Sequence, residues 1–215
     1  MRLYGFWRST ATWRARIALA YKGLDYEYVP VHLRKDGGEQ HRPDFRAKNP
    51  IGHVPVLELA IGGRERRVAE SFAILELLEE LHPAPPLLPS DPFLRARARQ
   101  LALVVVSGIQ PLQNTAVQLF VENELKANAS AWTRHWVTRG LAALESLVKE
   151  TAGVYAVADA VSYADVCLAP QMYFARRFEI DLAPYPTLTA IDAACARLPA
   201  FVRAHAEAQP DAQLD

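Results

Sequence analysis

The spacing of hydrophobic positions changes along the chain and divides it near residue 82. In the first part, residues 2–6 and 26–31 are short runs rich in apolar, aromatic and branched side chains, which predict two strands. The apolar positions between these runs recur at helical spacing: Trp13, Ile17, Ala20, Tyr21 and Leu24. Gly23 is placed to end that helix, since glycine favours helix C-termini.

Two more strands and a helix follow before residue 82. Residues 55–59 and 66–69 are short apolar runs, and Gly62-Gly63 between them is typical of a hairpin turn. A helix is predicted to begin at Ser71, with leucines on one side and glutamates on the other. The first two strands, separated by a helical crossover, should be parallel, and the last two, joined by a tight turn, should be antiparallel. This order predicts a mixed four-strand sheet with helices on both faces, which is the thioredoxin-like arrangement.

Beyond residue 82, a Pro-dense segment reads as a linker, and every later pattern is helical. Helices are predicted over the ranges 91–124, 131–149, 162–178, 187–196 and 199–206. The first of these should be one bent helix, interrupted at Gly108 and Pro111. The expected fold class is α/β plus all-α: a thioredoxin-like domain over 1–82, a linker over 83–90 and an all-helical domain over 91–215. The polar tail from Gln209 is expected to be frayed.

Composition narrows the possible function classes. The chain holds 24 Lys and Arg against 24 Asp and Glu, so its formal net charge is zero and nucleic acid is not an expected partner. No apolar run approaches the ~20 residues that a membrane helix needs, and no secretory signal is predicted. Cys167 and Cys195 do not have a metal-binding spacing, so no metal site is expected and a cytoplasmic location is predicted.

Three hydroxyl side chains lie at the first strand-to-helix turn: Ser9, Thr10 and Thr12. Any of them can cap the helix by accepting a hydrogen bond from a free backbone N–H group. Alternatively, one hydroxyl and the positive end of the helix dipole could stabilise a bound thiolate. The pattern of residues leaves both interpretations open.

Two further segments offer groups for a peptide-like ligand. Val54-Pro55 precedes a predicted strand, where a cis proline would turn the backbone of Val54 outward to pair with a bound peptide. An ordinary proline at the start of a strand is the alternative. Ser71 as a helix cap would explain the Glu70-Ser71 pair, but a helix N-terminus also binds carboxylates, and Glu70 could take an ammonium group. A ligand with an amino-acid end and a peptide backbone would suit these places.

These motifs, in this order, resemble the glutathione transferase superfamily. The turn through residues 13–19 looks like the zeta class, which includes the maleylacetoacetate isomerases, and bacterial maleylpyruvate isomerases are similar too. The likeness covers nearly the whole chain, including residues 49–57, 70–74 and 109–114. It implies an enzyme that uses glutathione as its cofactor, acts on a small dicarboxylate and forms a homodimer.

The resemblance also implies roles for individual residues. The catalytic hydroxyl groups near the glutathione sulfur would be those of Ser9, Thr10 and Thr12. Glutathione would be bound by His53, Val54, Pro55, Glu70, Ser71, Gln110 and Asn114, the last two reaching into the site from the helical domain. The carboxylates of the substrate would meet Arg8 and Arg177.

The chain departs from the class motif at Ala11, where the class usually carries Cys. Isomerisation does not require that Cys, because glutathione supplies the attacking thiol. Gln110 and Ala116 replace a His and an Arg of the maleylpyruvate isomerases, which favours the maleylacetoacetate isomerases. The implied function is cis–trans isomerisation of maleylacetoacetate or maleylpyruvate to the fumaryl isomer in the catabolism of tyrosine and other aromatic compounds. Transfer of glutathione to small electrophiles or halo-acids, and non-catalytic glutathione binding, remain alternatives.

Overall fold

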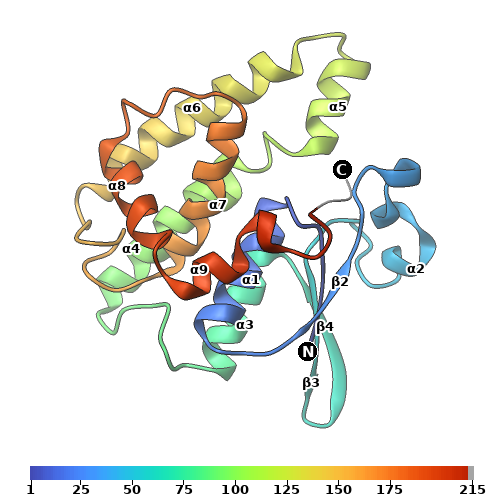
Figure 1. Cartoon of the computed structure of the whole chain (residues 1–215), viewed down its shortest axis with the longest axis horizontal. Coiled ribbons are helices and arrows are strands. Elements are labelled where there is room, and N and C mark those ends of the chain that lie inside the picture. Colours follow the sequence, from blue (N-terminus) through green and yellow to red (C-terminus); the bar gives the residue numbers. More distant parts are fainter. Residues whose placement is uncertain (213–215) are drawn as a thin grey trace. The chain divides into compact units, whose positions relative to one another are not determined.

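The computed structural model describes residues 1–212 and divides the chain into two compact units (Figure 1). The first unit contains Met1–Pro86 together with the segment from Leu198 onward, and the second contains Leu87–Arg197. Within the described residues, no helix is both long enough and apolar enough to cross a membrane.

The first unit is built on a four-strand sheet. Its strands are β1 (Arg2–Gly5), β2 (Glu27–Pro30), β3 (Val56–Ile61) and β4 (Arg64–Ala69), in the spatial order β2-β1-β3-β4. β1 runs parallel to β2, whereas β3 is antiparallel to both β1 and β4. The side chains of Leu3 and Leu57, paired across β1 and β3, are fully buried on one face of this sheet, and that of Val56 is fully buried on the other. The predicted thioredoxin-like sheet and its strand directions are confirmed.

Helices cover the sheet of the first unit: α1 (Thr10–Tyr21), α2 (Pro43–Arg46), α3 (Ser71–Leu81) and α9 (Pro199–Ala204). Three short 3-10 turns accompany them: Lys35–Gly37, Glu39–His41 and Ala206–Ala208. α1 packs against both α3 and α9. Burial of apolar side chains such as Ile17, Leu19 and Ile74 stabilises this packing, at roughly 1.5–3 kcal/mol for each large side chain.

The segment after Leu198 departs from the expected domain boundaries, because it belongs to the first unit and not to the helical one. The expectation of a frayed tail from Gln209 is wrong at Asp211, whose side chain is 3% exposed. The carboxylate of Asp211 accepts hydrogen bonds from the backbone N–H of Trp7 and the hydroxyl of Tyr28, which hold the tail against the first unit. Positions 213–215 of the expected helical domain lie outside the described residues.

Lys22, at the C-terminal end of α1, fixes the beginning of the Pro-rich segment. Its side chain is fully buried, and Nζ donates to the carboxylate of Glu79 at 2.7 Å. Nζ also donates to the carbonyl oxygens of His82 at 2.7 Å and Pro85 at 3.0 Å. Three acceptors therefore match the three hydrogens of the ammonium group.

The second unit contains the remaining helices: α4 (Pro92–Leu103), α5 (Thr115–Asn123), α6 (Ala129–Val148), α7 (Tyr163–Arg177) and α8 (Pro186–Cys195). The prediction of one bent helix over 91–124 is wrong. α4 runs into a π-helical turn, Val104–Ile109, and α5 begins separately after it. Pro111 has no N–H group to continue a helix, and the side chain of Asn114 caps a new one by accepting from the N–H of Ala116 at 2.9 Å.

A capping box formed by Ser162 and Asp165 begins α7. The fully buried carboxylate of Asp165 accepts hydrogen bonds from the N–H and the hydroxyl of Ser162, both at 2.8 Å. It also accepts from the N–H of Ala156 at 2.8 Å, which ties the preceding loop to the helix. Burial raises the pKa of Asp165 to about 6, although these hydrogen bonds oppose the rise.

Candidate functional site

The turn between β1 and α1 presents the three predicted hydroxyl groups in different ways. Ser9 caps α1, since its Oγ accepts from the N–H of Thr12 at 3.2 Å, and its own N–H donates to the carbonyl of Phe6 at 3.0 Å. Ser9 and Thr10 are partly exposed. Thr12 is fully buried, and its Oγ1 accepts from the N–H of Phe6 at 3.4 Å. Thr12 therefore supports the turn, while Ser9 and Thr10 are accessible to a ligand.

Gly5 shows how tightly this turn is packed. A Cβ atom at this position would lie 2.2 Å from Cγ2 of Thr12, so no larger residue fits here without a shift. Ala11, at the position of the usual Cys, is 7% exposed and belongs to the same packed region. The guanidinium of Arg8 lies 5.0 Å from the centre of the Trp7 ring, a cation–π arrangement, and Arg8 is partly exposed.

Val54 and Pro55 lie immediately before β3, and the peptide bond between them is cis, as the sequence suggested. The ladder between β1 and β3 begins at Val56, so Val54 lies just outside the paired part of the sheet. The side chain of Asn49 donates to the carbonyl of His53 at 2.8 Å and fixes the loop that leads to this position. The side chain of His53 is exposed.

The interpretation of Ser71 as the cap of α3 is wrong. Ser71 is the first helical residue and is 3% exposed, whereas Glu70 occupies the cap position with a φ of 68°. A positive φ is unfavourable for a residue with a Cβ, and such conformations persist where the surroundings enforce them, often at functional sites. The side chain of Glu70 makes no capping hydrogen bond, and the N-terminus of a helix suits an external carboxylate.

Gln110 and Asn114 lie in one segment of the second unit, between the π-helical turn and α5. Gln113, 3% exposed, anchors this segment to α7 through its side-chain amide. The amides of Gln113 and Gln171 exchange two hydrogen bonds, at 3.0 Å and 2.9 Å. The anchor is uncharged and buried, while Gln110 and Asn114 remain partly exposed.

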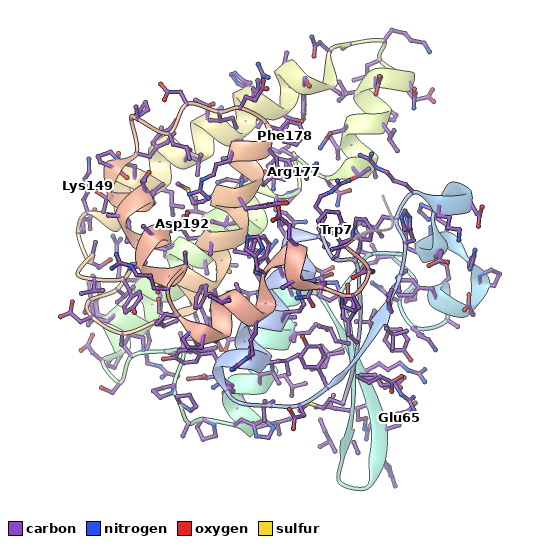
Figure 2. All side chains as sticks on the ribbon, in the orientation of Figure 1. Trp7, Glu65, Lys149, Arg177, Phe178 and Asp192 are labelled. Atoms are coloured by element: carbon purple, nitrogen blue, oxygen red, sulfur yellow. The ribbon has the colours of Figure 1, made fainter. Side chains whose placement is uncertain are left out.

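Arg177 is the last residue of α7, and Figure 2 shows it beside Phe178 at that end of the helix. The preceding Arg176 forms an ion pair with Asp192 on α8, which gives Arg176 a structural partner within the unit. The ring of Phe178 stacks on that of Phe174, with ring centres 4.5 Å apart. An arginine at the end of a helix also interacts favourably with the helix dipole, which gives Arg177 one structural role.

The chemistry of these groups favours an organic ligand over a metal. Residues 1–212 contain no group of three or more His, Cys, Asp or Glu side chains that could hold a metal ion. Cys167 and Cys195 are free and buried, and burial raises the pKa of the Cys195 thiol. The first unit instead offers groups that fit glutathione: a carboxylate at Glu70, the N-terminus of α3, a strand end at Val54 beyond the paired part of β3 and a hydroxyl at Ser9.

Comparisons with known proteins agree with this chemistry. Residues 3–86 match the family described as "Glutathione S-transferase, N-terminal domain". The chain is 49% identical to the maleylacetoacetate isomerase of Rattus norvegicus over 209 residues, which cover 97% of this chain and 94% of the relative.

Two solved structures are similar to this chain over nearly its whole length. A maleylacetoacetate isomerase from Anaeromyxobacter dehalogenans, with dicarboxyethyl glutathione and citrate in its active site, is 47% identical with a TM-score of 0.90, covering 98% of this chain and 96% of that one. A maleylpyruvate isomerase, described as a bacterial glutathione-S-transferase of the zeta class, is 42% identical with a TM-score of 0.91, covering 98% and 99%.

Proposed function

Because the chain belongs to the glutathione S-transferase superfamily, in the group of the maleylacetoacetate isomerases, we propose that it is a glutathione-dependent cis–trans isomerase. Its substrate is maleylacetoacetate or maleylpyruvate, and its product is the fumaryl isomer, formed during the catabolism of aromatic compounds such as tyrosine. The first unit binds glutathione, and the second unit contributes the residues for the substrate. The enzyme acts in the cytoplasm, which agrees with its free, buried cysteines.

The observation that carries the proposal is the hydrogen bonding of Ser9. Its Oγ accepts from the N–H of Thr12, so its own hydrogen remains available for donation to a sulfur anion. The dipole of α1 adds a positive potential at the same place. Together these groups lower the pKa of a thiol held there and keep it ionised near neutral pH.

Four groups of the first unit bind the peptide portion of glutathione. Glu70 pairs with the ammonium of the γ-glutamyl end, and Ser71 with the first N–H groups of α3 binds its carboxylate. The backbone of Val54, held before β3 with Pro55, pairs with the cysteinyl residue as an added strand would. His53 lies in the same loop and meets the glycyl carboxylate.

When bound, glutathione supplies a thiolate that adds to the cis double bond, permits rotation about the resulting single bond and leaves again. Arg8 and Arg177 each offer a guanidinium fork to one carboxylate of the substrate, which orients it. Ser9 and Thr10 stabilise negative charge on the sulfur when it leaves. Gln110 and Asn114 offer side-chain amide groups to the bound glutathione.

The first experiment is to assay isomerisation of maleylacetoacetate and of maleylpyruvate, each with and without glutathione. We expect turnover that requires glutathione, and a Ser9→Ala variant with kcat reduced about 10²–10³-fold and a raised pKa of the bound thiol. Ser146→Ala on the exposed face of α6 is the matched control and should behave as the wild type. Glutathione binding without turnover of either substrate would instead favour a transferase for halo-acids or a binding protein, with Ala11 as the first position to examine.

The dicarboxylate preference is tested at Arg177. Arg177→Ala should raise KM for dicarboxylates about tenfold and leave KM for neutral electrophiles unchanged, because only the former need the guanidinium. Arg134→Ala, which removes an exposed arginine paired with Glu179, is the control. Equal effects on charged and neutral substrates would refute a carboxylate-binding role.

A homodimer is part of this proposal. Large apolar side chains are exposed on α4 and α5: Phe93, Leu103, Leu119 and Phe120. Association of two copies would bury such side chains. Elution as a monomer at micromolar concentration on a calibrated sizing column would contradict it.

A further inference from the structure

The last described stretch of the first unit ends against the turn that carries Ser9. Asp211 lies 204 residues after Trp7 in sequence, yet its Oδ2 accepts the backbone N–H of Trp7 at 3.0 Å. The same oxygen accepts the hydroxyl of Tyr28 at 3.1 Å. With 3% of its surface exposed, Asp211 makes these hydrogen bonds largely out of water, where they are stronger than at a surface.

Arg16, on α1, binds the same peptide from its other side. Its Nη2 donates to the carbonyl of Trp7 at 2.8 Å, and its Nη1 donates to the carbonyl of Phe6 at 3.5 Å. Its Nε donates to the carbonyl of Ala204 at the end of α9, at 3.1 Å. Arg16 is fully buried, so one guanidinium joins α1, the turn and the C-terminal segment.

These contacts bear directly on Ser9. The N–H of Ser9 donates to the carbonyl of Phe6, which closes the turn, and Arg16 binds that same carbonyl. Trp7 is therefore held at its N–H by Asp211 and at its C=O by Arg16, two residues before Ser9. Burial lowers the pKa of Arg16, whereas Tyr28, Tyr26 and Asp211 act in the opposite direction.

We propose that Asp211 and Arg16 are positioning residues for the isomerase: together they fix the Trp7 peptide and thereby the direction of the Ser9 hydroxyl. The C-terminal segment thus takes part in catalysis without touching glutathione or substrate. This inference rests on the proposed function, because Ser9 is the group that it serves. A displacement of about 1 Å at a reacting group can reduce turnover about a hundredfold. Loss of the hydrogen bonds that Asp211 and Arg16 make to this turn, called the clamp below, should therefore lower the rate.

The test uses Asp211→Ala and Arg16→Lys in the full chain. Arg16→Lys keeps the charge, but the donors of an ammonium share one nitrogen and do not match carbonyls that three different nitrogens of the guanidinium reach. Asp211→Asn is the conservative variant, since its amide oxygen still accepts from Trp7 and Tyr28. Glu58→Ala is the matched control: it removes another buried carboxylate of the first unit, paired with Arg2 and Arg67 on the sheet.

We expect Asp211→Ala and Arg16→Lys to lower kcat at least about tenfold and to raise the pKa of the bound thiol, read by the ultraviolet absorbance of the thiolate. KM for glutathione should change less than about twofold, because the groups at Val54, Glu70 and Ser71 are untouched. Asp211→Asn should recover most of kcat. Unchanged kcat and thiol pKa in a folded Asp211→Ala or Arg16→Lys variant would overturn the inference, as would an equal loss in Glu58→Ala.

Amide hydrogen exchange separates this inference from the proposed function. Exchange in residues 6–9 should be faster in Asp211→Ala than in the wild type, whereas exchange in β3 should not change. If the wild type shows no turnover, the proposed isomerase is wrong, and faster exchange at the turn would still support the clamp. Unchanged exchange at the turn would overturn the clamp whatever the activity.

Discussion

Asp211 in the first unit and Asp165 in the second are both buried aspartates that accept backbone N–H groups, but their electrostatic surroundings differ. Asp211 lies in the field of the buried Arg16, which binds the carbonyl of the same residue, Trp7. Asp165 forms no ion pair with any residue in the described chain, and its partners are N–H groups and one hydroxyl. A buried cation therefore acts near Asp211, whereas burial pushes Asp165 toward its neutral form.

The largest effect should come from removing the cation. Arg16→Met should lower the free energy of unfolding by about 3–5 kcal/mol, because three carbonyl groups each lose a buried, charged donor. Chemical denaturation measures this loss. Arg42→Met, which removes an exposed arginine paired with Asp36 and Glu39, should cost no more than about 1 kcal/mol. Similar losses in the two variants would mean that the buried guanidinium contributes no more to stability than the exposed one.

The next effect is a pH dependence at Asp165. Its pKa is raised from an ordinary value of 3.8 to about 6, so between these values the folded protein holds a proton that the unfolded chain has released. The free energy of unfolding therefore falls as pH rises through this window, by about 3 kcal/mol at about 1.4 kcal/mol per pKa unit.

Asp165→Asn isolates this contribution, because the two proteins share their other titrating groups. The stability advantage of the wild type over Asp165→Asn should be about 2 kcal/mol greater at pH ~4 than at pH ~7, measured by urea unfolding at both values. A constant difference would mean that Asp165 titrates as an ordinary surface carboxyl.

A smaller effect should follow from removing the hydroxyl donor of Asp165. Ser162→Ala deletes a hydrogen bond of 2.8 Å and the capping hydroxyl of α7, and should cost about 1–2 kcal/mol. Loss of this donor should also raise the pKa of Asp165 further, which moves the pH window upward. Unfolding midpoints across a pH series measure both changes, and an unmoved window would exclude the hydroxyl as a determinant of the pKa.

The smallest effect should come from removing the hydroxyl of Tyr28, which donates a hydrogen bond to Asp211. Tyr28→Phe removes a single donor at 3.1 Å and leaves the N–H of Trp7 and the charge of Arg16 in place, so about 1 kcal/mol should be lost. Thermal or urea unfolding beside the wild type is sufficient to measure it. A loss as large as that of Arg16→Met would show that Tyr28, and not Arg16, supports this carboxylate.

Much of the fold could be predicted because its signals are local. Gly62 and Gly63 both adopt positive φ, 59° and 73°, so the hairpin is encoded by two adjacent residues. The break after α4 was missed because apolar residues continue on both sides of it, although Pro111 and the capping Asn114 mark it. The docking of Asp211 could not be predicted, since one polar residue in a polar tail carries no periodic pattern and its partner is distant in sequence.

The candidate site also contains features that the sequence predicts and features that it does not. The capping role of Ser9 followed from a hydroxyl before a helical pattern, and the structure contains that hydrogen bond. The position of Glu70 did not follow, because a positive φ at a glutamate has no signature in the sequence. The burial of Arg16 could not be predicted either. An arginine in a helical pattern is expected to be exposed, and the carbonyls that accept from Arg16 come from α9 and from the turn.

The three acceptors around Lys22 have a practical consequence for labelling the amines of this protein. Its Nζ has no exposed surface and no hydrogen left for another partner, whereas Lys35, Lys126 and Lys149 are exposed. An amine-specific reagent should therefore modify those three quickly and reach Lys22 only when the Pro-rich segment near His82 and Pro85 detaches. The rate of acylation at Lys22, followed by mass spectrometry, therefore reports how often that segment opens.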